Sequence, residues 1–339
     1  MTAMNPLNPP GTPTSPAVQA AFEDFARELN LDGDERRDAR ERLTEITQHL
    51  VDEGVIADFF LQGSLARRTM ISPLRDIDAV VILSPEHEHL RHEGEGAHRA
   101  AGLVGDVLRR QYPNAAHDRS RHSVKLDLGE DTFSFDVVPA FESLDASDDV
   151  EIMDLDRGAW SSSNSRELIR VVAERDTWCD GAFVQQVRFV KHFVRRELGT
   201  DFPGLHVEAI AYGSVTERLG HAEAVEMIIL AGARLLGPLQ SYSDPTGRER
   251  LDVKLDTGVR ERARQVFEGA ARRVGDAMDQ ALEGRDEQAI SIFAGLFGEP
   301  FPKRTAPRPV RRLAPGAATA AALRAVEPPT PTARAWRAT

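Results

Sequence analysis

The chain has 339 residues, of which 41% are hydrophobic and 28% charged. These proportions are typical of a soluble globular protein and not of a disordered or membrane protein. The single cysteine, Cys179, excludes an internal disulfide and favours a reducing compartment. The apolar runs are too short to span a bilayer, and the first residues lack a basic region followed by an apolar core. We therefore expect a cytoplasmic protein without a membrane segment.

Charge is unevenly distributed along the chain. The whole chain carries −12, and residues 303–339 carry +7 from eight Lys/Arg and one Glu, which leaves −19 for residues 1–302. So acidic a body is a poor match for a long phosphate backbone, whose binding depends on cation contacts. We expect no binding of bulk nucleic acid, although a single nucleotide can still bind through local cations and metal ions.

The amino-terminal half reads as a mixture of helices and strands. Helical spacing of apolar residues predicts helices over 16–30, 34–54 and 94–111. Alternating or apolar runs predict strands over 55–62, 76–83, 122–128, 132–138 and 151–155. After Trp160 the pattern changes to successive amphipathic helices, the last of them over 286–297.

These patterns divide the chain into four parts. We expect a disordered segment over 1–15, a core over 16–160 that includes two amino-terminal helices, a helical lobe over 161–302, and a disordered Pro/Ala/Arg-rich tail over 303–339. The fold class is therefore α/β (α+β) with two lobes, in which a mixed sheet is followed by helices. An active site is expected between the lobes.

Two aspartates, Asp76 and Asp78, stand at the head of the strand predicted over 76–83. Residues i and i+2 of a strand point to the same face, so the two carboxylates lie together. Like charges this close repel one another unless a cation lies between them. Because Mg²⁺ favours oxygen ligands, often carboxylates together with substrate phosphates, the pair predicts a metal site.

A third carboxylate, Asp136, lies in the strand predicted over 132–138. If that strand neighbours the first, three carboxylates meet at one place. Such a set can hold the ion pair of an in-line phosphoryl transfer. An exposed strand end would explain Asp76 alone, but it does not explain the combination.

The Gly63-Ser64 pair precedes the two aspartates and fits a phosphate group. Gly63 allows the backbone to approach a ligand closely. Ser64 offers a hydroxyl at a strand-to-helix turn, where free N–H groups attract phosphate. Arg67 and Arg68 lie just beyond and add positive charge.

At this point the sequence resembles a known family. LQGSLARRTMISPLRDIDAVVIL (61–83) and FDVVPAF (135–141) resemble the nucleotidyltransferase signature of the polymerase-β-like superfamily. The similarity is greatest to the CD-NTases, the bacterial relatives of cyclic GMP-AMP synthase and oligoadenylate synthase. It continues in GAWSSSNSREL (158–168), VRFVKHFVRRE (187–197), LHVEAIA (205–211) and ISIFAGLFGEPFP (290–302). The resemblance thus spans about residues 16–302 and implies a bilobal polymerase-β-like fold.

The resemblance implies a role for each matching position. Asp76 and Asp78 would ligate the metal ions, expected to be Mg²⁺ with Mn²⁺ as an alternative, and Asp136 would complete the site and help to activate the acceptor hydroxyl. Gly63 and Ser64 would grip the donor triphosphate, and Lys191 would contact it from the helical lobe. A solvated lysine on an amphipathic helix is the other reading of Lys191.

The sequence departs from the family pattern at two places. Gly204-Leu205-His206 stands where relatives often have a serine before the aromatic residue. Asn164 is followed by Ser165 where relatives usually have proline. No role is therefore assigned to Asn164, and a phosphate or base contact from the first segment is not expected.

The resemblance implies the synthesis of a cyclic di- or trinucleotide second messenger from NTPs, with release of pyrophosphate. In the family, such products activate a downstream effector in CBASS antiphage defence. The basic tail is either a docking segment for a regulatory partner or a solvated extension. Two other functions stay open: an RNA-terminal nucleotidyltransferase of the CCA-adding or poly(A) type, and an inactive scaffold. The acidic body argues against the first, and the complete set of aspartates argues against the second.

Overall fold

A computed structural model describes residues 15–31, 33–129, 133–144 and 149–303 of the protein. The segments predicted to be disordered, 1–15 and 303–339, lie almost entirely outside the described residues. No helix in the described part of the chain is both long and apolar enough to cross a membrane.

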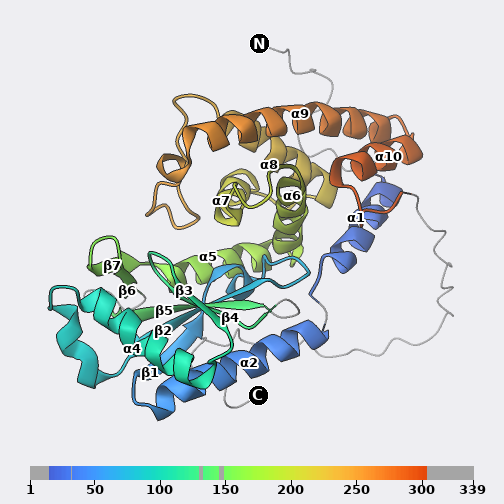
Figure 1. The fold of residues 1–339 in the computed structure, drawn as a ribbon. Coiled ribbons are helices and arrows are strands. Elements are labelled where there is room, and N and C mark those ends of the chain that lie inside the picture. The colour runs from blue at the N-terminus through green and yellow to red at the C-terminus, as the bar shows by residue number, and fades with distance from the viewer. Residues whose placement is uncertain (1–14, 32, 130–132, 145–148, 304–339) are drawn as a thin grey trace.

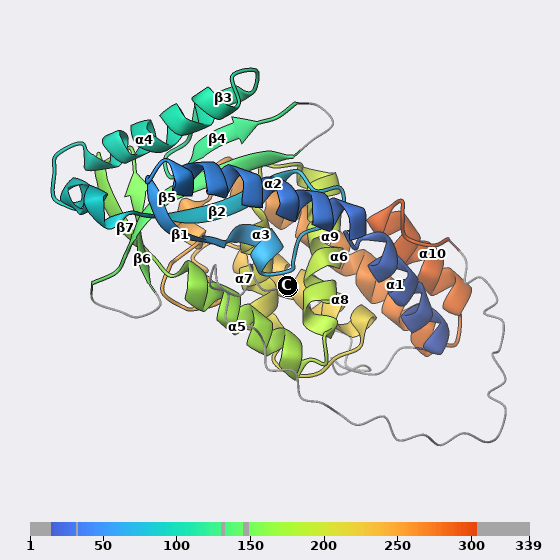
Figure 2. The same ribbon diagram turned by 90° about the horizontal axis from the view of Figure 1, so that it is seen from below.

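The described elements form a sheet half and a helical half, which lie at opposite sides of the molecule in Figures 1 and 2. The sheet half contains α2 (Gly33–Asp52), β1 (Ile56–Leu61), α3 (Gly63–Ala66), β2 (Asp76–Leu83), the 3₁₀ helix η1 (Pro85–Arg91), α4 (Gly96–Gln111), β3 (Ala116–Arg119), β4 (Val124–Asp127), β5 (Ser134–Glu142), β6 (Val150–Asp154) and β7 (Ala159–Ser163). The helical half contains α1 (Pro16–Glu28), α5 (Ser165–Trp178), α6 (Ala182–Leu198), α7 (Gly204–Ser214), α8 (His221–Leu235), the 3₁₀ turn η2 (Asp252–Lys254), α9 (Thr257–Leu282) and α10 (Asp286–Phe297). The predicted mixed α/β fold class is confirmed.

The sheet is mixed, as predicted. Its strands run in the order β1-β2-β5-β4-β3, and β6 pairs with both β5 and β7. The pair β2–β5 is parallel and the other pairs are antiparallel. The sequence did not predict β3 and β7, because AHDR and AWSSS are short polar segments that lack an alternating apolar pattern.

The two faces of the sheet differ in chemistry. Ile77, Ala79 and Val81 of β2 are fully buried in the core that α2 and α4 form against the sheet. Since side chains alternate along a strand, Asp76 and Asp78 lie on the opposite face. That face carries a small apolar cluster made by Phe60, Val80, Ile82, Val138, Ala140 and Val150. The carboxylates therefore stand at the end of a strand whose rigid support is buried on both sides.

The position of α1 corrects one part of the predicted division. The sequence placed both amino-terminal helices with the sheet, but α1 belongs to the core of the helical half. Phe22 and Phe25 of α1 contact phenylalanines of the helical half. Together these side chains form the phenylalanine cluster, which we define as Phe22, Phe25, Phe189, Phe293, Phe297 and Phe301. The helical pattern identified the apolar face of α1 correctly, whereas the elements that cover this face are α6, α8, α10 and Phe301.

Candidate active site

The register of β2 against β5 brings the predicted carboxylates to one edge. Asp78 is the direct partner of Asp136 in this parallel pair, and Asp76 is the partner of Ser134. Neighbouring strands lie about 4.8 Å apart, so partners on the same face have adjacent side chains. The condition set by the sequence, that the strand of Asp136 neighbours that of Asp76 and Asp78, is met.

The carboxylates are gathered, but two of the three, Asp76 and Asp136, are hydrogen-bonded to nearby serine hydroxyls. Ser134 Oγ donates to Asp76 Oδ1 at 2.6 Å, and Ser123 Oγ donates to Asp136 Oδ1 at 2.8 Å. Among the residues that the structure describes, no three His, Cys, Asp or Glu side chains are grouped so that they could hold a metal ion. Rotation of the side chains is therefore needed before Asp76, Asp78 and Asp136 can share an ion.

The electrostatics of Asp78 fit such an ion. Burial, together with repulsion from Asp136, raises its pKa to about 6, although Arg67 acts in the opposite direction. A carboxyl group held above its usual pKa by neighbouring carboxylates is stabilised in its charged form when a cation enters. The donor set consists of carboxylate oxygens, which Mg²⁺ and Mn²⁺ accept. The residues present therefore fit a divalent metal ion.

Gly63 makes room for Asp78. Its φ is +69°, a backbone conformation that residues other than glycine rarely adopt. A Cβ at this position would lie 1.9 Å from Asp78 Oδ2. The sequence predicted that Gly63 lets the backbone approach a ligand; in the structure, the group that approaches it closely is the Asp78 carboxylate. Ser64 lies in the following turn of α3, and among the described residues its hydroxyl has no hydrogen-bond partner.

We expect Gly63→Ala to lower the catalytic rate about a hundredfold, because a displacement of about 1 Å at a reacting group has an effect of this size. Initial rates of pyrophosphate release measure it. Gly181→Ala is the matched control, since Gly181 has φ +81° and open space where its Cβ would lie. The two variants should lose similar stability, and only the first should lose activity. Equal activities would show that Asp78 tolerates displacement.

Lys191 lies in a buried ion cluster that joins the two halves. Its Nζ is 3.1 Å from Glu208 Oε1, and Arg67 Nε donates to Glu208 Oε2 at 2.5 Å. Thr69 Oγ1 also donates to Glu208 Oε1, at 2.7 Å. Lys191 and Glu208 belong to α6 and α7, whereas Arg67 and Thr69 follow α3. These four residues are called the Glu208 cluster below. The ammonium of Lys191 is thus paired with a carboxylate and is not solvated.

Glu208 is charged despite full burial. Burial alone raises its pKa, but the Arg67 guanidinium and the Lys191 ammonium lower it to about 2. Burial lowers the pKa of Lys191, against the attraction of Glu208. No role is predicted for Glu208 from the sequence; the signal that could have found it is an acidic residue in the largely apolar helix GLHVEAIAYGS.

The two departures from the family pattern have structural explanations. A Cβ at Gly204 would lie 2.7 Å from Lys191 Cε and 3.0 Å from its Nζ, so glycine leaves room for the lysine to reach Glu208. Asn164 Nδ2 donates to Asp244 Oδ2 at 3.0 Å and to Thr246 Oγ1 at 2.5 Å. Asn164 therefore fastens the segment between α8 and α9 to the start of α5.

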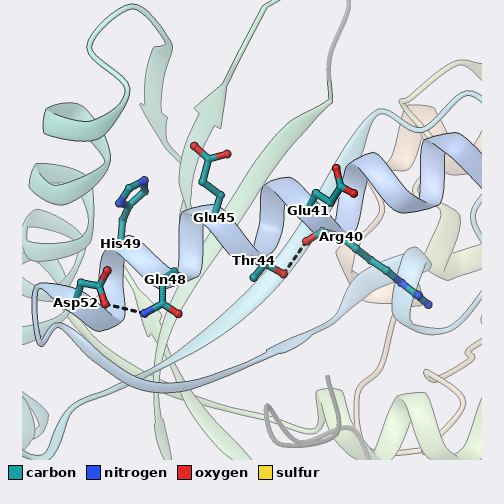
Figure 3. A pocket seen from close by; sticks show the side chains of 7 residues that line it. All are labelled: Arg40, Glu41, Thr44, Glu45, Gln48, His49 and Asp52. Carbon is teal, nitrogen blue, oxygen red and sulfur yellow. Dashed lines mark hydrogen bonds between the residues drawn. The ribbon is translucent and has the colours of Figure 1, made fainter. Parts of the chain in front are cut away.

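Two hollows on the described surface are lined by residues other than Asp76, Asp78 and Asp136. One is the exposed face of α2, shown in Figure 3, where the lining consists of Arg40, Glu41, Thr44, Glu45, Gln48, His49 and Asp52. A single helix face cannot enclose a nucleotide. The other has a volume of about 1160 Å³ and lies between the start of α2 and β4; it reaches Arg75 and Ser134, next to Asp76.

Comparison with known proteins agrees with this geometry. The family described as the Second Messenger Oligonucleotide or Dinucleotide Synthetase domain matches residues 17–176, a range that contains Gly63, Asp76, Asp78 and Asp136. No protein of curated function matches the chain.

Several solved structures share the fold. CdnC of E. coli MS115-1, with ATP, is 18% identical with a TM-score of 0.63, over 84% of this chain and 98% of that one. The CD-NTase CdnG of Bradyrhizobium diazoefficiens, in complex with GTP, is 14% identical with a TM-score of 0.64, over 83% and 98%. The apo form of Vibrio cholerae DncV is 14% identical with a TM-score of 0.56, over 84% and 80%. Residues 17–176 therefore resemble the second messenger oligonucleotide or dinucleotide synthetase domain, and the fold expected from the resemblance to the CD-NTases is confirmed.

Proposed function

We propose that the protein is a metal-dependent nucleotidyltransferase that joins NTPs into a cyclic di- or trinucleotide second messenger. The observation that carries the proposal is the placement of Asp76, Asp78 and Asp136 on the adjacent strands β2 and β5, inside the matched domain. Mg²⁺, or Mn²⁺ in its place, would supply charge neutralisation for the triphosphate when bound. Asp76, Asp78 and Asp136 would hold it.

The reaction follows from the roles of the protein groups. A 2′- or 3′-hydroxyl oxygen of the acceptor attacks the α-phosphorus of the donor, and the bond to pyrophosphate breaks. Asp136, at the centre of the edge, would take the hydroxyl proton. Ser64, whose hydroxyl has no partner among the described residues, would donate to the donor phosphates. A second transfer of the same kind closes the ring, so catalysis consists mainly of positioning and charge stabilisation.

Lys191 would contact the donor triphosphate only after a change of partner. Its ammonium is bound to Glu208 in the structure, with 12% of the side chain exposed. A triphosphate placed beside Arg67 offers more negative charge than a single carboxylate, so it would compete with Glu208 for Lys191. The role that the sequence predicted for Lys191 is retained here as part of the proposal.

The biological role and the domain limits belong to the same proposal. We place the enzyme in the cytoplasm, in CBASS antiphage defence, where its product would activate an effector. CdnC has been solved in a complex with HORMA-deltaN, which supports a regulatory protein partner for this chain as well. We keep residue 160, after which the sequence pattern changes to successive helices, as the boundary between the catalytic core and the helical lobe. Helix α1 is assigned to the helical lobe.

Incubation with labelled NTPs and Mg²⁺, with and without tRNA, tests the proposal. We expect a phosphatase-resistant product without RNA, and mass spectrometry of that product gives its bases and ring size. Label found only on the RNA would replace the proposal by an RNA-terminal nucleotidyltransferase. If no label is incorporated under either condition, with candidate activators added, a scaffold is the better interpretation.

A further inference from the structure

Lys125 is a cation on the catalytic face of the sheet for which the reaction above has no role. It lies on β4 as the direct antiparallel partner of Asp136 on β5, so the two side chains share a face. Lys125 Nζ is 3.7 Å from Asp136 Oδ1, and 45% of the lysine side chain is exposed. Lys125 also lies close enough to Asp78 to act on its charge.

The same oxygen of Asp136 is held from a second direction. Ser123 Oγ donates to Asp136 Oδ1 at 2.8 Å, and Ser120 Oγ lies 2.7 Å from Ser123 Oγ. Lys125 lies on β4, and Ser123 immediately precedes this strand. Together they turn Asp136 Oδ1 toward β4 and away from the β2 side, where Asp78 lies.

Two cations, Arg67 and Lys125, act on the charge of Asp78, and they differ in how firmly they are paired elsewhere. Arg67 donates two bonds to Glu208 and stays buried in the Glu208 cluster. Lys125 has no ion-pair partner other than Asp136 within the described residues. Of these two cations, Lys125 is thus the one paired with Asp136 itself, and a divalent ion has to compete with its ammonium for that carboxylate.

We propose that Lys125 is a positioning residue that competes with the divalent metal ion for Asp136 and thereby weakens the binding of the free ion. The inference rests on the proposed metal site and deepens it. To displace Lys125, the ion must gain more binding free energy than its contact with Asp136 alone provides. An ion that arrives with a triphosphate brings phosphate oxygens that can accept hydrogen bonds from the released ammonium. Free metal alone brings none, so the lysine favours entry of the ion together with its nucleotide.

Binding of Mn²⁺ alone to the full chain, followed by the loss of the electron paramagnetic resonance signal of free Mn²⁺, tests the inference. Lys125→Met should bind Mn²⁺ about five- to tenfold more tightly than the unchanged protein at low salt, the size expected for a unit charge about 4 Å away at a partly exposed site. The difference should shrink at high salt, because salt screens exposed charges. Lys125→Gln provides a second neutral variant, and Lys125→Arg should bind like the unchanged protein.

Lys254→Met is the matched control. Lys254 is 53% exposed and paired with Glu249, so this change removes the same charge from a comparable environment away from the carboxylates. Equal Mn²⁺ affinity of Lys125→Met and the unchanged protein would overturn the inference, as would an equal gain in Lys254→Met. The variant Asp136→Asn distinguishes failure of the proposed metal site from failure of the proposed role of Lys125. If Asp136→Asn binds Mn²⁺ like the unchanged protein, the metal site itself is wrong; if it loses binding while Lys125→Met changes nothing, only the role of Lys125 is wrong.

Discussion

Asp78→Asn is expected to lower nucleotidyl transfer by about a thousandfold or more and to leave the fold intact. Asparagine has nearly the same shape but carries no charge, so it removes a proposed metal ligand at the point where charge develops. Burial and Asp136 already disfavour the charged form of Asp78. Its neutralisation should therefore leave the free energy of unfolding of the metal-free protein unchanged or raise it, as is common when a functional charge is removed.

Initial rates of pyrophosphate release at saturating Mg²⁺ and NTP, and urea unfolding of the same samples, measure both effects. Asp118→Asn, on the exposed edge strand β3, is the control for loss of an aspartate and should keep full activity. An Asp78→Asn protein that is folded and retains more than a tenth of the activity would rule out the metal assignment.

The raised pKa of Asp78 also predicts a dependence on pH. Because the pKa is about 6, the carboxyl group of the metal-free protein is protonated below that pH and charged above it. Metal binding requires the charged form and releases the proton, so the affinity for Mn²⁺ should fall up to tenfold for each pH unit below about 6. Titrations at pH 5 and pH 7 measure this change, and the difference should be smaller in Asp78→Asn.

The second large effect is expected at Glu208. Glu208→Ala should lower the free energy of unfolding by about 3–5 kcal/mol, since removal of one member of a buried ion cluster leaves the others uncompensated. The charges left behind are Arg67 and Lys191, both nearly buried. Urea unfolding at pH 7 gives the value. Glu197→Ala, a more exposed glutamate on α6, is the control and should change stability by less than about 0.5 kcal/mol.

A double variant tests the origin of the loss. Lys191→Met added to Glu208→Ala removes one uncompensated cation and should recover part of the stability, which a double-mutant cycle measures. Simple additivity of the two losses would mean that the pair does not interact. The pH dependence gives an independent check. The pKa of Glu208 is about 2 in the folded protein and about 4.5 normally, so its contribution is complete above 4.5 and is lost as the pH falls from 4.5 toward 2.

The sequence predicted the strand edge that carries Asp76, Asp78 and Asp136 better than its surroundings. The strand over 76–83 has the predicted bounds because a long apolar run follows the two aspartates, and Asp136 lies beside it as the motif required. Whether the carboxylates converge could not be predicted, because it depends on donors from other elements, Ser123, Ser134 and Lys125.

Long-range pairing explains the other differences. Glu208 is paired with Arg67 across 141 positions of the chain, and no local pattern reports such a contact. The sequence predicts that Gly63 makes room for a bound ligand, because it does not show how closely the Asp78 carboxylate approaches the Gly63 backbone. The partner of α1 was missed for the same reason, since periodicity identifies the buried face of a helix and not the element that covers it.

The placement of α1 has a consequence for the order in which the chain folds. From α2 to β7 the sheet half follows one continuous stretch of sequence, whereas α1 precedes it and contacts α6 and the segment after α10. During synthesis from the amino terminus, α1 therefore has no core to join until the whole sheet half has been made. The phenylalanine cluster closes only after Phe301 has left the ribosome. Contacts of such sequence separation form late, so α1, which precedes the sheet half in the chain, is among the last elements to become stable.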